Sequence, residues 1–231
     1  MSEVKERHSR NIPSVSAEDM ERIARSRVLV AGCGGLGGNI IEHLARMGVG
    51  TIIAADGDVF EESNLNRQVL SLPGNLGSRK AAAAADRVRA IDPSINVTAV
   101  CEYITKENAP ALLADADLVM DALDNAGARL MLEDAAEEAG VTIIHGAIRG
   151  WDLQVMSVPP GSGLLHEIYG DSYEPDSKTS LPVTPAACAA LQAALAIQCL
   201  CGHGSAMDGK ILTGSLEDMR FDAVSLAAGD E

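Results

Sequence analysis

Hydrophobic positions along the first two thirds of the chain alternate between two periodicities. Short apolar runs of strand length occur at residues 28–31, 51–55, 96–100, 118–125 and 141–145. Stretches with helical spacing or a high alanine content separate them, at residues 39–47, 78–90, 106–113 and 126–139. This alternation predicts an α/β fold with a Rossmann-like, doubly wound and mostly parallel sheet.

The alternation of predicted strands and helices ends after residue 146. Residues 151–158 predict another strand, and residues 210–216 and 219–224 predict a closing hairpin, so we expect C-terminal antiparallel strands to extend the sheet. Residues 184–201 predict a long helix with almost no charge, which should be buried on most sides. Residues 164–185 have little periodicity and many Ser, Pro and Asp residues, which favours a mobile loop that crosses over the sheet.

The first 27 residues are polar and precede this pattern. Composition alone favours a solvated arm at residues 6–11, whereas Ser16 can cap a helix over residues 16–25. With 231 residues and 47% hydrophobic content, the chain suits one domain with a full core. We assign that domain to residues 28–226, the arm and helix to 1–27, and an acidic tail to 227–231.

Charge and cysteine content narrow the classes of function. A net charge of −15 argues against nucleic acid or an anionic membrane surface as the partner. We see neither a signal-peptide core nor an unbroken apolar run of about 18 residues, so we expect no membrane span. Five cysteines without a CxxC pair indicate reduced thiols in a cytoplasmic protein and no obvious zinc knuckle.

A glycine-rich turn at residues 32–37 joins the first strand to the first helix of the pattern, and the next strand ends at Asp56. Such a turn directs backbone N–H groups and a helix N-terminus at a phosphate, and the acid receives a ribose hydroxyl. In isolation the glycines are equally consistent with a tight turn. The flanking strands and the acid at the expected distance favour a nucleotide site.

Other polar groups follow the strands or begin the helices. Residues 57–68 combine amide, hydroxyl and guanidinium groups beyond a strand's carboxyl end, where ligands of open α/β sheets bind. Lys80 lies in a helical first turn, where a cation opposes the dipole, so it either serves a ligand or is tolerated at the surface. Asp121 and Asp124 can form a turn and a helix cap, or can hold Mg²⁺.

Taken in order, these motifs resemble one family. They are GCGGLG (32–37), DGD (56–58), SNLNRQ (63–68), the helix start at 77–80, DALDN (121–125) and HGAIRG (145–150). The chain resembles the ThiF/MoeB/HesA proteins, E1-like enzymes that activate ubiquitin-like sulfur carrier proteins. The resemblance extends from Arg7 to the closing hairpin.

The resemblance implies an ATP-dependent adenylyltransferase that forms an acyl-adenylate on the C-terminal Gly-Gly of a carrier and releases pyrophosphate. It also implies a homodimer in which Arg10 reaches into the neighbouring subunit's site. By match to the family's motifs, Gly35 lies at the phosphates and Asp56 at the ribose. Asn64, Arg67 and Lys80 contact the phosphates, Asp124 holds Mg²⁺, Asn125 lines the pocket, and Ser63, Leu65 and Asn66 form its wall with Arg67.

The chain departs from the family at two places. Many relatives bind structural zinc through two CxxC pairs, but here residues 164–168 and the C-terminus lack them, so we expect no zinc. Residues 170–185 contain no cysteine for a thioester or persulfide, and we expect Cys188, Cys199 and Cys201 to be core residues. We therefore expect the reaction to stop at the acyl-adenylate. His145 is expected to be a strand-end residue.

Two rival interpretations remain. An NAD-binding oxidoreductase of the same fold would also use Asp56, but it would not account for Arg67, Lys80 and the acid-amide pair at 124–125. A non-catalytic scaffold that binds a ubiquitin-like protein would not need the complete group of predicted nucleotide-binding residues. Thiamine, molybdenum cofactor and other sulfur-transfer routes stay open, as does a peptide C-terminus as the acceptor.

Overall fold

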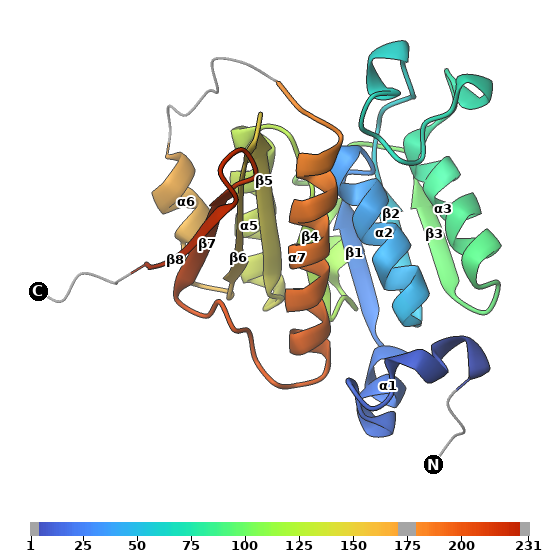
Figure 1. Ribbon diagram of the computed structural model, residues 1–231, viewed down its shortest axis with the longest axis horizontal. Coiled ribbons are helices and arrows are strands. Elements are labelled where there is room, and N and C mark those ends of the chain that lie inside the picture. The colour runs from blue at the N-terminus through green and yellow to red at the C-terminus, as the bar shows by residue number, and fades with distance from the viewer. Residues whose placement is uncertain (1–4, 171–178, 227–231) are drawn as a thin grey trace, which may run out of the picture.

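One eight-stranded sheet runs through residues 5–170 and 179–226, which are the residues that the computed structural model describes. Its order is β3-β2-β1-β4-β5-β6-β7-β8 (Figure 1). The first five strands pair in parallel: β1 (Arg27–Ala31), β2 (Thr51–Ala55), β3 (Asn96–Val100), β4 (Leu118–Asp121) and β5 (Ile143–Arg149). The predicted parallel, Rossmann-like half is confirmed.

The C-terminal strands extend this sheet in the antiparallel sense. They are β6 (Asp152–Val158), β7 (Lys210–Ser215) and β8 (Arg220–Ser225), and each pairs with the strand before it. The turn between β5 and β6 carries Trp151, whose side chain is partly exposed and whose carbonyl accepts a hydrogen bond from the Leu216 N–H at 3.0 Å. The predicted extension is therefore confirmed.

Helices cover both faces of the sheet. One face carries α2 (Gly35–Met47), α3 (Lys80–Ile91) and α7 (Val183–Leu200), and the other carries α4 (Ala109–Leu113), α5 (Ala126–Ala139) and α6 (Leu164–Tyr169). Alternate residues of β1 divide accordingly: Val28 and Val30 pack in the first core, and Leu29 and Ala31 in the second. Because the parallel strands are buried on both faces, their sequences are continuous apolar runs and do not alternate between apolar and polar residues.

The apolar helix α7 is long and apolar enough to span a membrane by length and composition alone. It packs against α2, β5 and β6, and it buries Cys188, Ala189 and Gln192. Its opposite side is exposed and lined by alanines at positions 186, 190 and 194. The expectation that it is buried on most sides therefore holds for only part of its surface.

The N-terminal segment is more ordered than the predicted solvated arm. Residues Glu6–Asn11 form the 3-10 helix η1, and the buried His8 ring packs against Gly48, which ends α2 in a left-handed conformation with φ of 87°. The next helix, α1 (Ala17–Ile23), begins as predicted, since Ser16 Oγ accepts a hydrogen bond from the Asp19 N–H at 3.1 Å. The solvated-arm interpretation of residues 6–11 holds for the exposed Glu6, Arg7 and Arg10 but is wrong for His8, because the packing surface of His8 comes from a distant glycine.

A second difference lies in the stretch predicted as a loop. Residues 164–169 form α6, because the Glu133 carboxylate accepts the N–H groups of Leu165 and His166, both at 2.9 Å. Two further 3-10 helices, η2 (Glu62–Asn64) and η3 (Pro73–Asn75), lie between β2 and α3. Residues 171–178 of the predicted crossover loop lie outside the described residues.

Candidate functional site

A cavity of about 610 Å³ opens at the carboxyl ends of the parallel strands. Its walls come from the glycine turn after β1, the acids after β2, the loop after β4, and the turn between β5 and β6. Ligands of open α/β sheets bind at this edge, where the chain connections leave in opposite directions. The volume is that of a small-molecule site.

The glycine turn leaves no room for side chains on its inner side. Gly32 has φ of 95°, and a Cβ on it would lie 2.7 Å from the Ala122 carbonyl oxygen. A Cβ on Gly37 would overlap the Gly32 carbonyl oxygen. The helix α2 can therefore begin directly beside the strand end, and Gly34 and Gly35 line the cavity at its positive N-terminus.

Asp56 lines the cavity, and its hydrogen bonds also stabilise the carboxyl-end edge of the sheet. Its carboxylate accepts the Cys33 N–H at 2.7 Å and the Asp58 N–H at 2.8 Å. The same side chain therefore links the glycine turn to the segment that follows β2. Sequence reasoning assigned Asp56 to a ribose but did not anticipate this structural role.

Lys80 is buried and lines the cavity, which rules out the alternative of a tolerated surface cation. Its Nζ lies 2.9 Å from Asp58 Oδ2. The hydroxyl of Tyr103 donates to the other oxygen of Asp58, and the Tyr103 ring packs against Gly57. Asp58 and Tyr103 are cavity residues that the sequence analysis did not single out, although the DGD motif contained the first.

Arg67 is the second cation of the cavity wall. Its guanidinium donates to the Ser63 carbonyl oxygen at 3.0 Å and to Asn66 Oδ1 at 2.8 Å. Asn66 in turn donates from Nδ2 to the Ser180 carbonyl oxygen at 3.1 Å. This chain of contacts fixes Arg67 between the loop after β2 and the segment that leads into α7.

The four predicted wall residues that precede Arg67 do not line the cavity. Ser63, Asn64, Leu65 and Asn66 are absent from its lining, and Asn64 is buried with its Oδ1 accepting the Glu61 N–H at 3.0 Å. Of these four, Ser63 and Asn66 contact Arg67 and so support the wall. Their predicted contacts with the nucleotide remain predictions.

Asp124 and Asn125 line the cavity where the chain leaves β4. Asn125 Oδ1 accepts the Ala128 N–H at 2.8 Å and caps α5, a role that the sequence analysis had considered for the acids. Asp124 is exposed as well as part of the cavity lining. Asp121, in contrast, is buried.

Arg10 is far from the cavity of its own chain. It is exposed on η1, which packs at the C-terminal end of α2, whereas the cavity lies at the N-terminal end of that helix. The 13 residues of α2 separate the two ends by about 20 Å. Arg10 therefore does not lie with Arg67 and Lys80 in the cavity of its own subunit.

A buried polar network behind the cavity was missed by the sequence analysis. His145 Nδ1 lies 2.6 Å from Asp121 Oδ2, and His145 Nε2 lies 3.0 Å from the Tyr169 hydroxyl. Gln154 donates to that hydroxyl at 2.8 Å. Arg129 lies 3.4 Å from the same Asp121 oxygen and stacks over the Tyr169 ring.

Charge in this network is fixed by burial and pairing. Burial lowers the pKa of His145, against the opposing effect of Asp121, so the imidazole is neutral near pH 7. Burial opposes ionisation of Asp121, but the hydrogen bond with His145 and the charge of Arg129 outweigh it and lower the pKa of this carboxyl. Arg129, Gln154 and Tyr169 line the cavity, while His145 and Asp121 position them from behind.

Cys33 and Cys188 are poor nucleophiles. Burial and the neighbouring Asp56 raise the pKa of Cys33 well above its usual value. Burial raises the pKa of Cys188 to about 12. Since the thiolate is the reactive form, neither side chain suits a thioester step.

Comparison with known proteins gives a consistent picture. A model described as the ThiF family matches residues 7–231. The chain is 36% identical to the SAMP-activating enzyme E1 of Haloferax volcanii over 227 residues, which cover 95% of this chain and 84% of the relative. It is 35% identical to the sulfur carrier protein adenylyltransferase of Thermus thermophilus over 215 residues, which cover 87% and 79%.

Solved structures with this fold include the E. coli MccB protein crystallised with ATP, with a TM-score of 0.79 and 20% identity. The superposition covers 99% of this chain and 73% of MccB. The structure of PaaA gives a TM-score of 0.76 at 23% identity, over 91% of this chain and 76% of that one. At these identities the likeness concerns the fold.

Proposed function

Since the chain belongs to the ThiF family and is an adenylyltransferase of the ThiF/MoeB type, we propose that it adenylates the C-terminal glycine of a ubiquitin-like sulfur carrier protein. The products would be an acyl-adenylate and pyrophosphate. The names of the two relatives described above support a carrier of this class as the partner.

One observation carries the proposal. Arg67 and Lys80 converge with Asp56 and Asp124 on a single cavity, over a glycine turn and the N-terminus of α2. A triphosphate and a carboxylate repel each other, so their reaction requires positive groups around both. A dinucleotide, which carries only a diphosphate, would not require two cations and a metal-binding acid.

The chemistry requires no general base. The carrier's terminal carboxylate is ionised near pH 7, so its oxygen can attack the α-phosphorus directly. A new phosphorus–oxygen bond forms while the bond to the bridging oxygen breaks, and pyrophosphate leaves with that electron pair. Lys80 and Arg67, together with the N–H groups at Gly34 and Gly35, would stabilise the charge that grows on the phosphates.

The residues present fit a magnesium ion. The exposed Asp124 and Asn125 both line the cavity, and Mg²⁺ in phosphate sites is held by one or two carboxylates together with phosphate oxygens. When bound, the ion would neutralise phosphate charge, and Asp124 would fix its position. Lys80 keeps its pairing with Asp58 until phosphate oxygens replace that carboxylate as its partner.

We propose further that the reaction stops at the acyl-adenylate. The raised pKa values of Cys33 and Cys188, which follow mainly from burial, keep both thiols protonated at neutral pH. Mass spectrometry of the protein after incubation with ATP and a carrier should find no covalent carrier adduct. A carrier thioester or persulfide on any of the five cysteines would overturn this part of the proposal.

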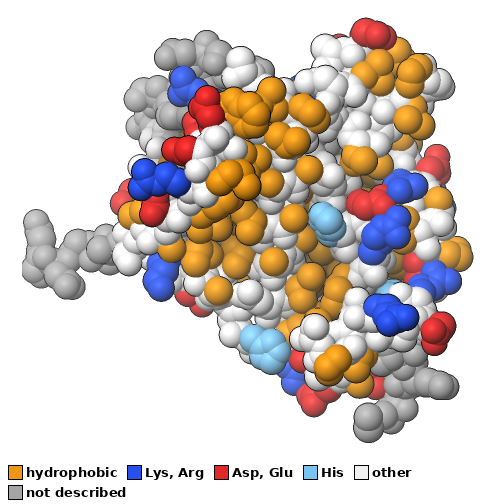
Figure 2. All heavy atoms as spheres, in the orientation of Figure 1, with side chains coloured by type: hydrophobic (Ala, Val, Ile, Leu, Met, Phe, Trp, Pro, Cys, Tyr) orange, Lys and Arg blue, Asp and Glu red, His pale blue; other side chains and the backbone are white. Residues whose placement is uncertain are grey.

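A homodimer with Arg10 acting across the interface completes the proposal. Arg10 lies about 20 Å from its own cavity, as α2 separates them, so it could act only on another copy. Figure 2 shows hydrophobic side chains gathered on the face that carries α7 and the antiparallel strands. The exposed alanines of α7 and the exposed Val183 and Phe221 belong to the described surface and would suit a second subunit.

The decisive test of the activity is ATP–pyrophosphate exchange with small proteins that end in Gly-Gly. Exchange that requires both Mg²⁺ and the terminal glycine supports the proposal. Exchange that is absent with every candidate carrier would support a non-catalytic scaffold. Stabilisation of the protein against heat by NAD but not by Mg²⁺–ATP would favour the oxidoreductase interpretation.

Complementation tests the role of Arg10. Arg10→Ala and Lys80→Met variants should each be inactive, but a mixture should regain about a quarter of wild-type activity, because half of randomly formed dimers contain one intact site. Gel filtration measures the oligomeric state, and co-purification of an untagged variant with a tagged one measures subunit exchange. A mixture in which subunits exchange without recovery would show that Arg10 does not act in the neighbouring site.

A further inference from the structure

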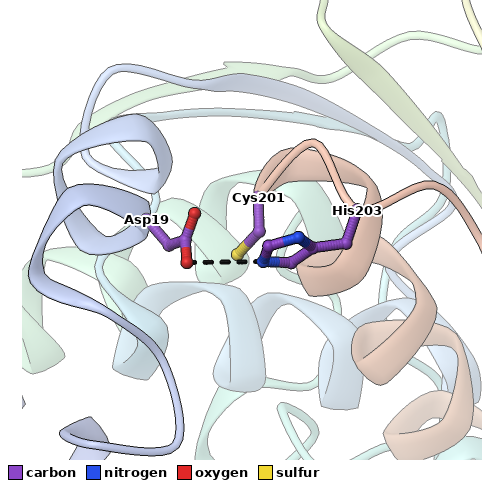
Figure 3. Close-up of side chains that lie close together, drawn as sticks. All are labelled: Asp19, Cys201 and His203. Atoms are coloured by element: carbon purple, nitrogen blue, oxygen red, sulfur yellow. Dashed lines mark hydrogen bonds and ion pairs between the residues drawn. The ribbon is translucent and has the colours of Figure 1, made fainter.

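A cluster of three potential metal ligands lies far from the cavity, where α1 packs against the end of α7. It consists of the Asp19 carboxylate, the Cys201 thiol and the His203 imidazole, whose ligand atoms all lie within 4.8 Å of one another. Figure 3 shows the sulfur and the imidazole nitrogen turned toward the same carboxylate. We propose that these three side chains bind a divalent transition metal ion, with Zn²⁺ as the best match.

The separation of the imidazole nitrogen and the carboxylate oxygen suits a tetrahedral ion, and the thiol sulfur lies within 4.8 Å of both. With ordinary zinc bond lengths, a nitrogen and an oxygen ligand are separated by about 3.3 Å, and either is about 3.6 Å from a sulfur ligand. His203 Nε2 lies 3.4 Å from Asp19 Oδ2, which is close to the required value. Three protein ligands leave one position for water, as in zinc sites with an open coordination position.

The local backbone explains how two residues so close in sequence face one ion. Cys201 ends α7, and Gly202 follows with φ of 77°, a left-handed conformation that reverses the chain direction. A Cβ at Gly202 would lie 2.8 Å from Arg22 Nη1, the end of a flexible side chain, so the positive φ is what favours glycine here. The His203 N–H then donates to the Gln198 carbonyl oxygen at 3.1 Å, which fixes the backbone that carries the imidazole.

The surroundings orient and neutralise the ligands. Ser16 Oγ donates to Asp19 Oδ2 at 2.7 Å, and this hydrogen bond fixes the orientation of the carboxylate. Arg22 lies beside the cluster, where its guanidinium donates to the Cys201 carbonyl oxygen at 2.9 Å and pairs with Glu18 at 2.8 Å. A thiolate, a carboxylate and a neutral imidazole would balance the charge of a divalent ion.

Asp19 and Cys201 are buried, whereas His203 is 65% exposed, so an ion could enter from the side of the imidazole. Burial and the Asp19 carboxylate raise the pKa of Cys201, so the metal-free thiol is protonated. Binding would replace that proton with the metal–sulfur bond and release it to the buffer. The combination of thiolate, imidazole and carboxylate favours Zn²⁺ over Mg²⁺.

This site differs from the one on which the expectation of no zinc was based. That expectation concerned the CxxC pairs of relatives, whereas the cluster combines a helix that precedes β1 with the turn after α7. A bound ion would link α1 to the end of α7. These two helices are far apart in the sequence, since α1 ends at Ile23 and the N-cap of α7 is Pro182. Its expected effect is on stability, and the proposal is independent of nucleotide binding.

The test is Co²⁺ titration of the full-length, chelator-treated and reduced protein without nucleotide. Wild type should bind about one Co²⁺ per chain with a thiolate-to-cobalt charge-transfer band, and Zn²⁺ should displace it. The His203→Gln variant should weaken binding by at least about tenfold, and its exposed position keeps the fold intact. The Cys201→Ser variant should lose the charge-transfer band.

The matched control is Cys199→Ser, which makes the same chemical change two residues away and outside the cluster. It should bind Co²⁺ with the wild-type band and affinity. Absence of a stoichiometric charge-transfer band in wild type would overturn the proposal. So would a band of wild-type strength in Cys201→Ser, or an unchanged affinity in His203→Gln.

Discussion

The contact between Gly37 and the Gly32 carbonyl oxygen offers a sharp test of how the nucleotide turn is built. A Cβ on Gly37 would lie well inside 3.0 Å of that oxygen, a separation that real Cβ atoms essentially never adopt. Both partners are backbone, so a side-chain rotation cannot relieve the overlap. In Gly37→Ala, α2 must therefore move away from the strand end by more than about 1 Å.

The magnitude follows from two opposing effects. Overpacking of a close-packed contact costs about 1–3 kcal/mol, and replacing a helical glycine by alanine returns up to about 1 kcal/mol. We expect a net loss of about 2 kcal/mol, which for a chain of this size lowers the melting temperature by roughly 4–8 °C. Because the N-terminus of α2 moves with the helix, activity should fall by about 100-fold.

Gly127→Ala is the matched control. Gly127 is also a helical glycine, in α5, but the nearest atom to its Cβ would be Asn125 Oδ1 at 3.9 Å, an ordinary contact. This variant should gain up to about 1 kcal/mol. Thermal unfolding with and without Mg²⁺–ATP, and ATP–pyrophosphate exchange, measure both effects. Equal melting temperatures and equal ATP affinities in the two variants would refute the reasoning.

Three further outcomes follow from the cavity and its buried network. Lys80→Met should lower ATP–pyrophosphate exchange by at least about 100-fold with less than about 1 kcal/mol change in stability, since its partner Asp58 is half exposed; a melting temperature that falls with activity would contradict this. Arg129→Met should cost about 3–5 kcal/mol in urea unfolding, because it leaves the buried Asp121 carboxylate without its cation, and a loss below about 1 kcal/mol would refute that pairing. Burial lowers the pKa of His145 below 6.5, so the unfolded chain takes up a proton that the folded chain does not, and stability should decrease as pH falls below 6.5. His145→Gln should reduce that slope in melts between about pH 5 and pH 7.5, and an unchanged slope would count against a neutral buried His145.

The sequence indicated the nucleotide half of the site because its determinants are local. The strand, glycine turn, helix and Asp56 lie within 30 consecutive residues, and each has its own signature of periodicity or backbone conformation. The alternating pattern was likewise enough to predict the sheet, because a buried parallel strand and a covering helix differ in period.

The missed features depend on partners that are distant in the chain. Tyr169 and Gln154 meet His145 only after β5, β6 and α6 have packed together, so the spacing of these residues carries no signal. The helix α6 begins after Gly163 without a side-chain cap of its own, and the capping carboxylate is Glu133. His8 was interpreted as solvated because its packing surface at Gly48 is formed by tertiary contact.

The position of Trp151 has a practical consequence. It is the single tryptophan of the 231-residue chain, and it lies between Arg149 and Asp152, which both line the cavity. Its indole is 42% exposed, so a change in its environment would alter its emission. Trp151 itself does not line the pocket, but we expect its emission to change when the neighbouring pocket is occupied, which would give a label-free binding assay.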